Sequence, residues 1–300
     1  MAQSDRTNVY QDITDAIIAD LENGCAPWAQ PWDSTAGAVP LTLPRNASTL
    51  RPYSGINILT LWSAVAKRKF TGHNWLTFRQ ALAVGGNVRK GEHGVTVVYA
   101  DRFTPEAARD HARETGDAAQ SIPFLKRFTL FNADQCEGLP VDPQAPVLPF
   151  EAIIPDANAA IAATGADMRI GGGDAFYHPI LDYVQVPPVH AYFDPINWYR
   201  TVFHELAHFS GHSSRLNHDQ SGAFGSSVYA REELVAEMAG AFVCATLGIT
   251  PTVRHADYIG SWIDCLREDS RAITRAASAA SKAADYILRR RETETRSEAA

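Results

Sequence analysis

The sequence predicts an α+β fold in two domains. Its 300 residues are enough for two domains, and 45% of them are apolar, as in ordinary globular proteins with buried cores. Apolar residues at helical spacing and short runs typical of strands occur in both halves, and helical patterns dominate the second. Four prolines, at 140, 143, 146 and 149, separate the halves. Because proline stiffens a chain, we expect a Pro-rich linker at 139–149 between domains at 1–138 and 150–300.

The N-terminal domain is expected to combine helices with a pair of strands. The predicted elements are helices at 8–21 and 58–69, a short helix ending at Ala83, and strands at 95–99 and 124–132. We expect the second strand to pair antiparallel with residues 95–103. The stretch between them, 104–121, is rich in Ala, Arg, Asp and Glu and is typical of an exposed insertion.

The C-terminal domain is expected to be mainly helical with a small sheet. The predicted elements are a helix at 150–164, strands at 168–170, 175–177 and 183–186, and helices after Asp194, at 229–242, at 255–266 and at 273–290. The helix after Asp194 has clear boundary signals, because Asp194 suits an N-cap, Pro195 the first helical position and Gly211 the stop. The tail at 291–300 is expected to fray.

Composition argues against a membrane protein and against a disulfide framework. No stretch approaches the roughly 18 continuous apolar residues of a transmembrane helix, and the first residues lack the apolar run of a signal peptide. We therefore expect a cytoplasmic protein with no membrane partner. The cysteines are scattered without close pairing, which predicts neither disulfides nor a metal knuckle. They are Cys25, Cys136, Cys244 and Cys265.

The most informative motif is His-Glu-x-x-His at 204–208. On a helix, His204 and His208 lie on one face about one turn apart, where two imidazoles can bind one cation. Glu205 lies beside them, where it can act as the base for attack by an activated water. The motif therefore predicts a catalytic metal site with Glu205 as its catalytic residue.

A third ligand is expected on the helix at 229–242. Two His and one Glu with an open fourth position form a standard catalytic zinc set. We predict Glu233 as the ligand and Glu237 as the acceptor for the free N–H of a ligand His, with Glu232 as the rival ligand. The alternative is that these glutamates form an exposed, solvated helix face. The expected cofactor is Zn²⁺, with Mn²⁺ or another divalent ion as the alternative.

The motif also resembles the metzincin pattern as far as Gly211. That pattern has a third His where this chain has Ser214. The departure favours a Glu-ligated, gluzincin-like site. His212 is expected to be a polar residue near the cleft and not a ligand.

Positive charge is concentrated in one part of the chain. The formal net charge is −7, but residues 45–103 hold nine Lys or Arg and two acids, a local charge of +7. Aromatic residues are interleaved with these cations, which suits a groove where bases stack on rings and cations follow the phosphates. The alternative is that most of the rings are core and most of the cations are solvated. The candidate DNA-binding residues are Arg51, Tyr53, Lys67, Arg68, Lys69, Trp75, Arg79, Arg89 and Lys90.

Taken together, these patterns resemble the ArdC antirestriction family over nearly the whole chain. The matching stretches are 9–13, 27–28, 31–32, 46–47, 52–57, 75–80, 85–94 and 130–132 in the N-terminal half, and 175–177, 182–183, 187–188, 203–208, 211–216, 229–237 and 256–262 in the C-terminal half. Departures are minor: Leu50, Ser54 and Phe209 stand where Gly, Arg and Trp are common in the family. The Ser54 difference removes one phosphate contact.

The resemblance implies an N-terminal α+β domain that binds single-stranded DNA and a C-terminal zincin-like metallopeptidase domain. It also adds Asn57 to the DNA-binding candidates. The implied function is antirestriction: the protein would bind single-stranded plasmid DNA entering by conjugation and protect it from host restriction. A restriction component is one candidate protein substrate. The alternative is an intracellular zinc metallopeptidase whose basic N-terminal domain recruits substrate. A primase accessory is disfavoured, because no polymerising set of carboxylates is visible.

Overall fold

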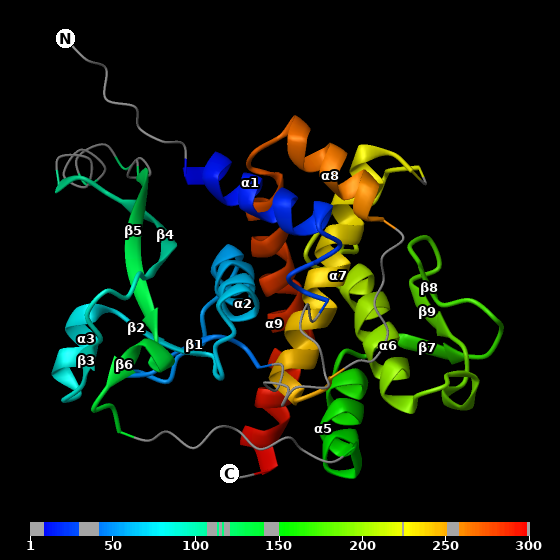
Figure 1. Cartoon of the computed structure of the whole chain (residues 1–300). Coiled ribbons are helices and arrows are strands. Elements are labelled where there is room, and N and C mark those ends of the chain that lie inside the picture. The colour runs from blue at the N-terminus through cyan, green and yellow to red at the C-terminus, as the bar shows by residue number, and fades with distance from the viewer. Residues whose placement is uncertain are drawn as a thin grey trace. The chain divides into compact units, whose positions relative to one another are not determined.

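The computed structural model describes residues 9–29, 42–106, 113, 116, 121–140, 150–223, 225–250 and 258–298 (Figure 1). The chain folds into two compact units. The larger unit contains Met1–Arg45, Pro52–His73 and Asp142–Ala300, and the smaller unit contains Asn46–Arg51 and Asn74–Val141. The first half of the chain therefore contributes to both units. The predicted linker at 139–149 lies outside the described residues except for Leu139 and Pro140.

The smaller unit is built on a sheet of four strands. Its strands, in spatial order, are β1 (Arg45–Asn46) at the margin, β2 (Asn74–Leu76), β5 (Ile122–Asn132) and β4 (Val95–Phe103). β4 and β5 pair in register from Val95 opposite Leu130 to Phe103 opposite Ile122, which confirms the predicted antiparallel pair. Most of the insertion predicted at 104–121 lies outside the described residues.

A short helix and a second strand pair complete the smaller unit. α3 (Phe78–Ala83) begins with a capping box, in which the Gln80 N–H donates to Thr77 Oγ1 (3.2 Å) and the Thr77 N–H donates to Gln80 Oε1 (2.9 Å). β3 (Asn87–Val88) pairs with β6 (Cys136–Glu137), which follows the 3-10 turn η1 (Ala133–Gln135). The apolar cluster that joins these pieces contains Leu76, Ala81, Val88 and Cys136.

The larger unit is a group of helices around α7 (Ser227–Leu247). The other helices are α1 (Val9–Glu22), α2 (Ile56–Arg68), α5 (Phe150–Ala163), α6 (Pro195–Ser210), α8 (Ile259–Glu268) and α9 (Ala272–Glu298). α7 packs against both α6 and α9 (Figure 1), and nearly every side chain from Ala230 to Ala245 is buried. Because α7 is enclosed, polar groups on it need partners inside the unit. α9 is helical to Glu298, so it runs past the predicted end at 290 into the stretch expected to fray.

A small sheet lies beside α6 in the larger unit. Its order is β7 (Asp167–Ile170), β9 (Tyr183–Val186) and β8 (Phe176–His178). β9 pairs parallel with β7 and antiparallel with β8. β8 is therefore an edge strand, and both β8 and β9 contact α6. None of the helices in the described ranges is long and apolar enough to cross a membrane.

Candidate metal centre

α6 presents the His-Glu-x-x-His motif on one continuous helix. It begins after Asp194 with Pro195 in its first turn, and it ends at Gly211, whose N–H donates to the His208 carbonyl (2.9 Å). These are the predicted boundaries, although Asp194 makes no side-chain capping bond and Gly211 keeps a right-handed backbone. Because the helix is regular throughout, His204 and His208 face the same side.

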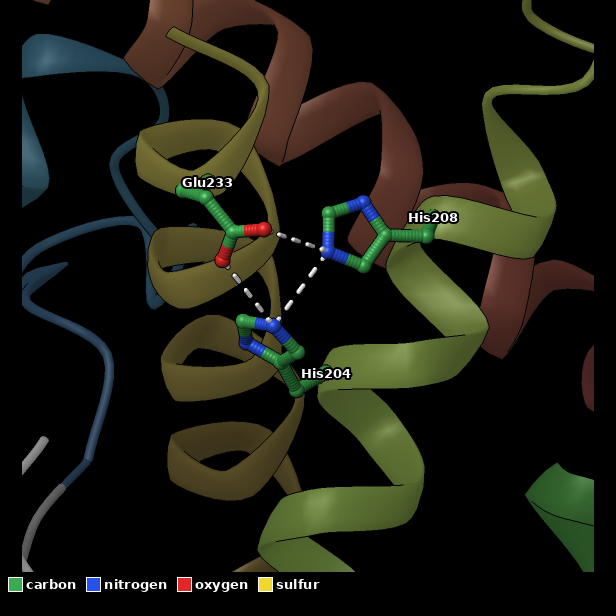
Figure 2. Close-up of side chains that lie close together, drawn as sticks. All are labelled: His204, His208 and Glu233. Atoms are coloured by element: carbon green, nitrogen blue, oxygen red, sulfur yellow. Dashed lines mark hydrogen bonds and ion pairs between the residues drawn. The ribbon is translucent and has the colours of Figure 1, made fainter. Parts of the chain in front are cut away.

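The two imidazoles converge with Glu233 of α7 (Figure 2). The Nε2 atoms of His204 and His208 are 3.3 Å apart, and carboxylate oxygens of Glu233 lie 3.4 Å and 3.6 Å from them. An ion with tetrahedral bonds of about 2.0–2.1 Å separates its ligand atoms by about 3.3–3.4 Å. The spacing therefore fits one small divalent cation. Within the described ranges, no other group of His, Cys, Asp or Glu is arranged in this way.

His204 is held from behind by Glu237. Its Nδ1 lies 3.1 Å from Glu237 Oε1, a position from which the carboxylate can accept the imidazole N–H. Glu237 also forms a buried ion pair with Arg200, one helical turn before His204 on α6. Gly240 makes room for this pair, since a Cβ at that position would collide with the Arg200 guanidinium.

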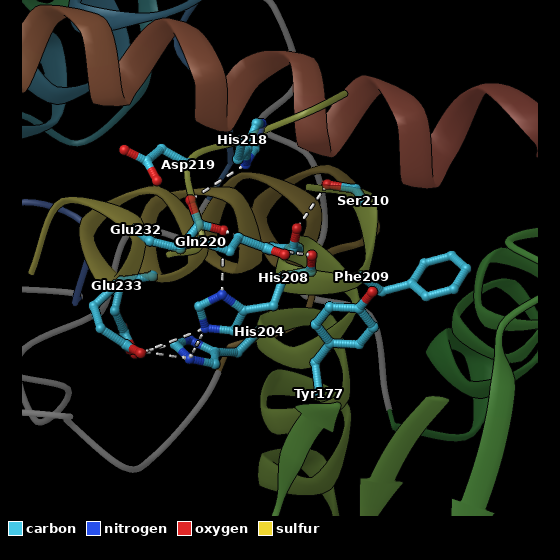
Figure 3. Close-up of polar contacts among 12 residues, drawn as sticks. Tyr177, His204, His208, Phe209, Ser210, His218, Asp219, Gln220, Glu232 and Glu233 are labelled. Carbon is cyan, nitrogen blue, oxygen red and sulfur yellow. Dashed lines mark hydrogen bonds and ion pairs between the residues drawn. The ribbon is translucent and has the colours of Figure 1, made fainter. Parts of the chain in front are cut away.

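His208 has a corresponding partner in Glu232 (Figure 3). Its Nδ1 lies 3.3 Å from Glu232 Oε1, and Gln220 Nε2 donates to the same oxygen (3.0 Å). The other oxygen of Glu232 lies 3.4 Å from Nδ1 of His218. Glu232 was the rival ligand to Glu233, and the structure places it behind His208 and away from the point where the three ligand atoms converge.

The glutamates of α7 are buried, and the pKa values of Glu232 and Glu233 are lowered. Glu232, Glu233 and Glu237 are each less than a tenth exposed, so the alternative of a solvated helix face is wrong. Burial alone would raise the pKa of Glu232, but hydrogen bonds from His208 and His218 lower it to about 2. Burial alone would lower the pKa of His204, but hydrogen bonds to Glu233 and Glu237 raise it to about 10. The centre thus holds carboxylates in the form that binds cations.

A pocket of about 490 Å³ opens over the three residues. It is lined by Glu205, which is 7% exposed, and on one side by the edge strand β8 through Phe176 and Tyr177. Among the described residues that line it, the carboxylates are Glu205, Asp219, Glu232 and Glu233, and none is Lys or Arg. The pocket is therefore acidic, which favours cations and disfavours phosphate groups.

The loop after α6 is tied to the sheet that forms the pocket wall. Arg215 donates to Asp182 (3.0 Å) and stacks over the Phe209 ring at 3.6 Å, and Tyr177 donates to Asp182 (2.8 Å). These contacts position the strand that faces the ligands. His212, which the sequence predicts not to be a ligand, lies outside the pocket lining, with Nδ1 2.8 Å from Ser214 Oγ.

The candidate DNA-binding residues fall in both units. The exposed ones are Arg51, Lys67, Arg68, Lys69, Arg79, Arg89 and Lys90, and the half-buried ones are Tyr53 and Asn57. Tyr53, Asn57 and Lys67–Lys69 belong to the larger unit, and the others to the smaller unit. Trp75 is 0% exposed, so its ring is part of the core and offers no face to a base.

Lys67 and Arg89 are among the cations that already have protein partners. Lys67 Nζ lies 2.6 Å from Asp20. Arg89 donates to the carbonyls of Asp134 and Cys136 and lies 3.2 Å from Glu92, so it joins the loop before β4 to η1 and β6. Its role is at least partly structural.

Several residues of the centre carry no signal in the sequence. His218 and Gln220 come from an irregular loop whose path is set by tertiary contacts. Arg200 is different, because it lies four residues before His204 on the same helix face. A charged residue on the face that carries the motif could have indicated a buried acid opposite it.

Comparisons with known proteins agree with both halves of the chain. A family model described as the N-terminal domain of anti-restriction factor ArdC matches residues 7–131, and one described as a zincin-like metallopeptidase matches residues 155–279. An uncharacterised protein of Sinorhizobium fredii, y4eC, is 38% identical over 94% of this chain and 92% of its own length. DNA primase TraC of Escherichia coli is 35% identical over 93% of this chain, but the match spans only 27% of TraC.

Two solved structures are similar to the whole chain. The metal-free structure of the antirestriction protein ArdC from plasmid R388 has a TM-score of 0.80 and 38% identity, with 95% of this chain and 98% of that chain covered. The Mn(II)-bound structure of the same protein has a TM-score of 0.76 and 36% identity, with coverage of 94% and 98%.

Proposed function

The chain belongs to the ArdC family of antirestriction proteins, and on that basis we propose that it protects single-stranded DNA entering by conjugation from host restriction. In this proposal it acts in the cytoplasm, binds the single strand directly, and carries a metal-dependent peptidase centre. The observation that carries the peptidase part is the convergence of His204, His208 and Glu233 beneath a pocket that also exposes Glu205.

We assign His204, His208 and Glu233 as the ligands of a divalent ion, either Zn²⁺ or Mn²⁺. Their mutual spacing supports this, and a relative of the same fold has been solved with Mn(II) bound. When bound, such an ion polarises a peptide carbonyl and acidifies water. Glu205 takes the proton from the attacking water and delivers it to the leaving amine. Glu237 and Glu232 hold the Nδ1 atoms, so that both Nε2 lone pairs face the ion.

The substrate of the metal pocket is proposed to be a polypeptide and not DNA. Within the part of the chain that the structure describes, four carboxylates and no Lys or Arg line the pocket, which would repel a phosphodiester. The edge strand β8 along the pocket can also pair with an extended peptide. A restriction component is a substrate of this class.

Single-stranded DNA is proposed to bind the smaller unit, on the two-stranded ribbon of β4 and β5 and the neighbouring α3. Tyr99 is 50% exposed and Phe128 44%, with ring centroids 6.5 Å apart, and Phe78 on α3 is 48% exposed. Lys126, opposite Tyr99 in the register, and Arg127, opposite Val98, are exposed on the same ribbon. Exposed rings beside cations suit stacked bases and their phosphates. Arg79 and Lys90 are further exposed cations of this unit.

The second candidate function is a metallopeptidase whose basic residues only recruit its substrate. It is favoured by the match to a zincin-like metallopeptidase and by the acidic pocket. A primase activity is not proposed, because the match covers only a minor part of TraC.

One set of measurements separates these functions. Single-strand binding by the purified full chain would be titrated at several salt concentrations, and protection would be scored as transfer of a plasmid into restricting and non-restricting recipients. We expect affinity for the single strand to fall as salt rises, and transfer into the restricting recipient to increase. Casein cleavage without single-strand affinity and without protection would instead support the second candidate.

A further inference from the structure

Tyr229 lies in the first turn of α7, four residues before Glu233. Residues at that spacing share one helix face. Burial raises the pKa of the Glu233 carboxyl, and a hydrogen bond from the Tyr229 hydroxyl is one of the contacts that lower it. Both side chains line the metal pocket. The sequence pattern does not single out Tyr229, because its contact with the candidate metal centre exists only in the fold that brings Glu233 to the histidines.

A second tyrosine supports the first. The hydroxyl of Tyr258 lies 3.3 Å from that of Tyr229. An ionised carboxylate can only accept, so Tyr229 donates to Glu233 and its oxygen is left to accept the hydrogen of Tyr258. The chain of hydrogen bonds therefore runs from Tyr258 through Tyr229 to Glu233. Such chains strengthen each donor in turn.

Tyr258 is itself held in place by packing. It is the N-cap residue of α8, and its ring lies 6.1 Å from that of Trp262, which is fully buried. Trp262 in turn packs edge-on against Trp28 at 5.5 Å. The donor at the start of the chain of hydrogen bonds is thus fixed by aromatic contacts of the larger unit.

We propose that Tyr229 is a positioning residue of the metal centre, which fixes the carboxylate of Glu233, and that Tyr258 acts through it. This rests on the proposed ligand set. It completes a pattern in which each ligand has its own polar partner: Glu237 for His204, Glu232 for His208 and Tyr229 for Glu233. A ligand held in place before the ion arrives loses less freedom on binding, and such partners are worth about 10–100-fold in metal affinity.

The test uses tyrosine-to-phenylalanine changes in the full chain, with Zn²⁺ and Mn²⁺ affinities measured by calorimetry and the metal-free unfolding temperature by circular dichroism. Tyr229→Phe should weaken metal affinity by about tenfold and leave the metal-free unfolding temperature unchanged. Tyr258→Phe should weaken it less, and adding Tyr258→Phe to Tyr229→Phe should weaken it no further. Tyr10→Phe, on α1 and outside the lining of the metal pocket, is the matched control and should leave metal affinity unchanged.

Metal affinity within twofold of the wild type in Tyr229→Phe would overturn the proposal. The proposal would also be overturned if Tyr258→Phe lowered metal affinity by the same factor in the wild type and in Tyr229→Phe, because Tyr258 would then not act through Tyr229. If Tyr229→Phe also lowers the metal-free unfolding temperature, Tyr258→Phe is compared with Tyr10→Phe. Weaker metal affinity in Tyr258→Phe alone supports the proposal, and equal metal affinity in these two variants overturns it. His204→Ala tests the ligand set separately from the role of Tyr229. If metal still binds to His204→Ala, the proposed ligand set is wrong. If His204→Ala loses metal binding while Tyr229→Phe keeps wild-type affinity, only the inference about Tyr229 is wrong.

Discussion

The metal centre of the larger unit and the β4–β5 ribbon of the smaller unit treat polar side chains in opposite ways. In the centre, carboxylates and imidazoles are buried, and each is held by a specific partner. On the ribbon, rings and cations are exposed at successive strand positions. A buried, paired group is costly to disturb, whereas surface binding is shared over many residues. Single changes should therefore have large and separable effects in the centre and small, cumulative effects on the ribbon.

The largest effect is expected from Glu205→Gln. The amide keeps the size of the side chain but cannot take a proton, so casein cleavage should fall by about 10²–10⁴-fold. Metal and single-strand affinities should not change. Glu137→Gln, an exposed change in the smaller unit, is the control. Cleavage that persists in Glu205→Gln would remove this residue as the base. If antirestriction survives while cleavage is lost, peptidase activity is dispensable for protection.

His204→Ala is expected to weaken metal affinity by more than about a hundredfold, the upper range for residues that only support a ligand. Metal-dependent thermal stabilisation should disappear with it, because an ion that binds only the folded chain stabilises it by mass action. His212→Ala should behave like the wild type, since His212 lies outside the pocket. Calorimetric titration with Zn²⁺ and Mn²⁺ checks both. Single-strand affinity that falls in parallel with metal affinity would mean that the two regions are not independent.

Glu237→Gln and Glu232→Gln should differ, although both remove a partner of a ligand histidine. Glu237→Gln leaves the buried Arg200 guanidinium without its counter-charge, so it should lower the free energy of unfolding by about 3–5 kcal/mol. Glu232→Gln should mainly weaken metal affinity, by about 10–100-fold. Denaturant unfolding of the metal-free chain separates the two. An equal loss of stability in both variants would show that the Arg200–Glu237 ion pair does not account for the effect of Glu237→Gln on the free energy of unfolding.

The smallest effect is expected from the double change Arg79→Ala with Lys90→Ala. Single-strand affinity should fall a few-fold and evenly across sequences, and the slope of log K against log salt should become shallower by about 1.4, about 0.7 for each lost phosphate contact. Metal affinity should be unchanged, and Lys282→Ala on α9 is the matched control. Arg89 is left in place because it bonds to backbone carbonyls and its loss would also disturb the fold. An unaltered salt slope would place the DNA elsewhere.

Candidate nucleic-acid-binding residues are harder to choose from sequence than the proposed metal ligands, because the local sequence does not determine which side chains are exposed. Trp75 and Tyr99 are both aromatic and both near cations, yet one is 0% exposed and the other 50%. Lys67 and Arg89 are cations of the predicted patch, and each is engaged by a group distant in sequence. Which ring faces solvent and which cation is already paired follows from contacts between segments far apart in the chain.

By itself, the sequence determined the helix that carries His204 and His208, its start and its stop, and the antiparallel pair of β4 and β5. These features depend on residue spacings of four or of two, which neighbouring residues encode directly. Only the tertiary structure decided that Glu233 meets the imidazoles while Glu232 stands behind one of them, and that Tyr229 reaches Glu233. It also decided that α1 and α2 pack in the same unit as the metal helices. The reason is that adjacent side chains on a helix differ in direction by about 100°, and which direction meets α6 depends on packing between helices that the local pattern does not record.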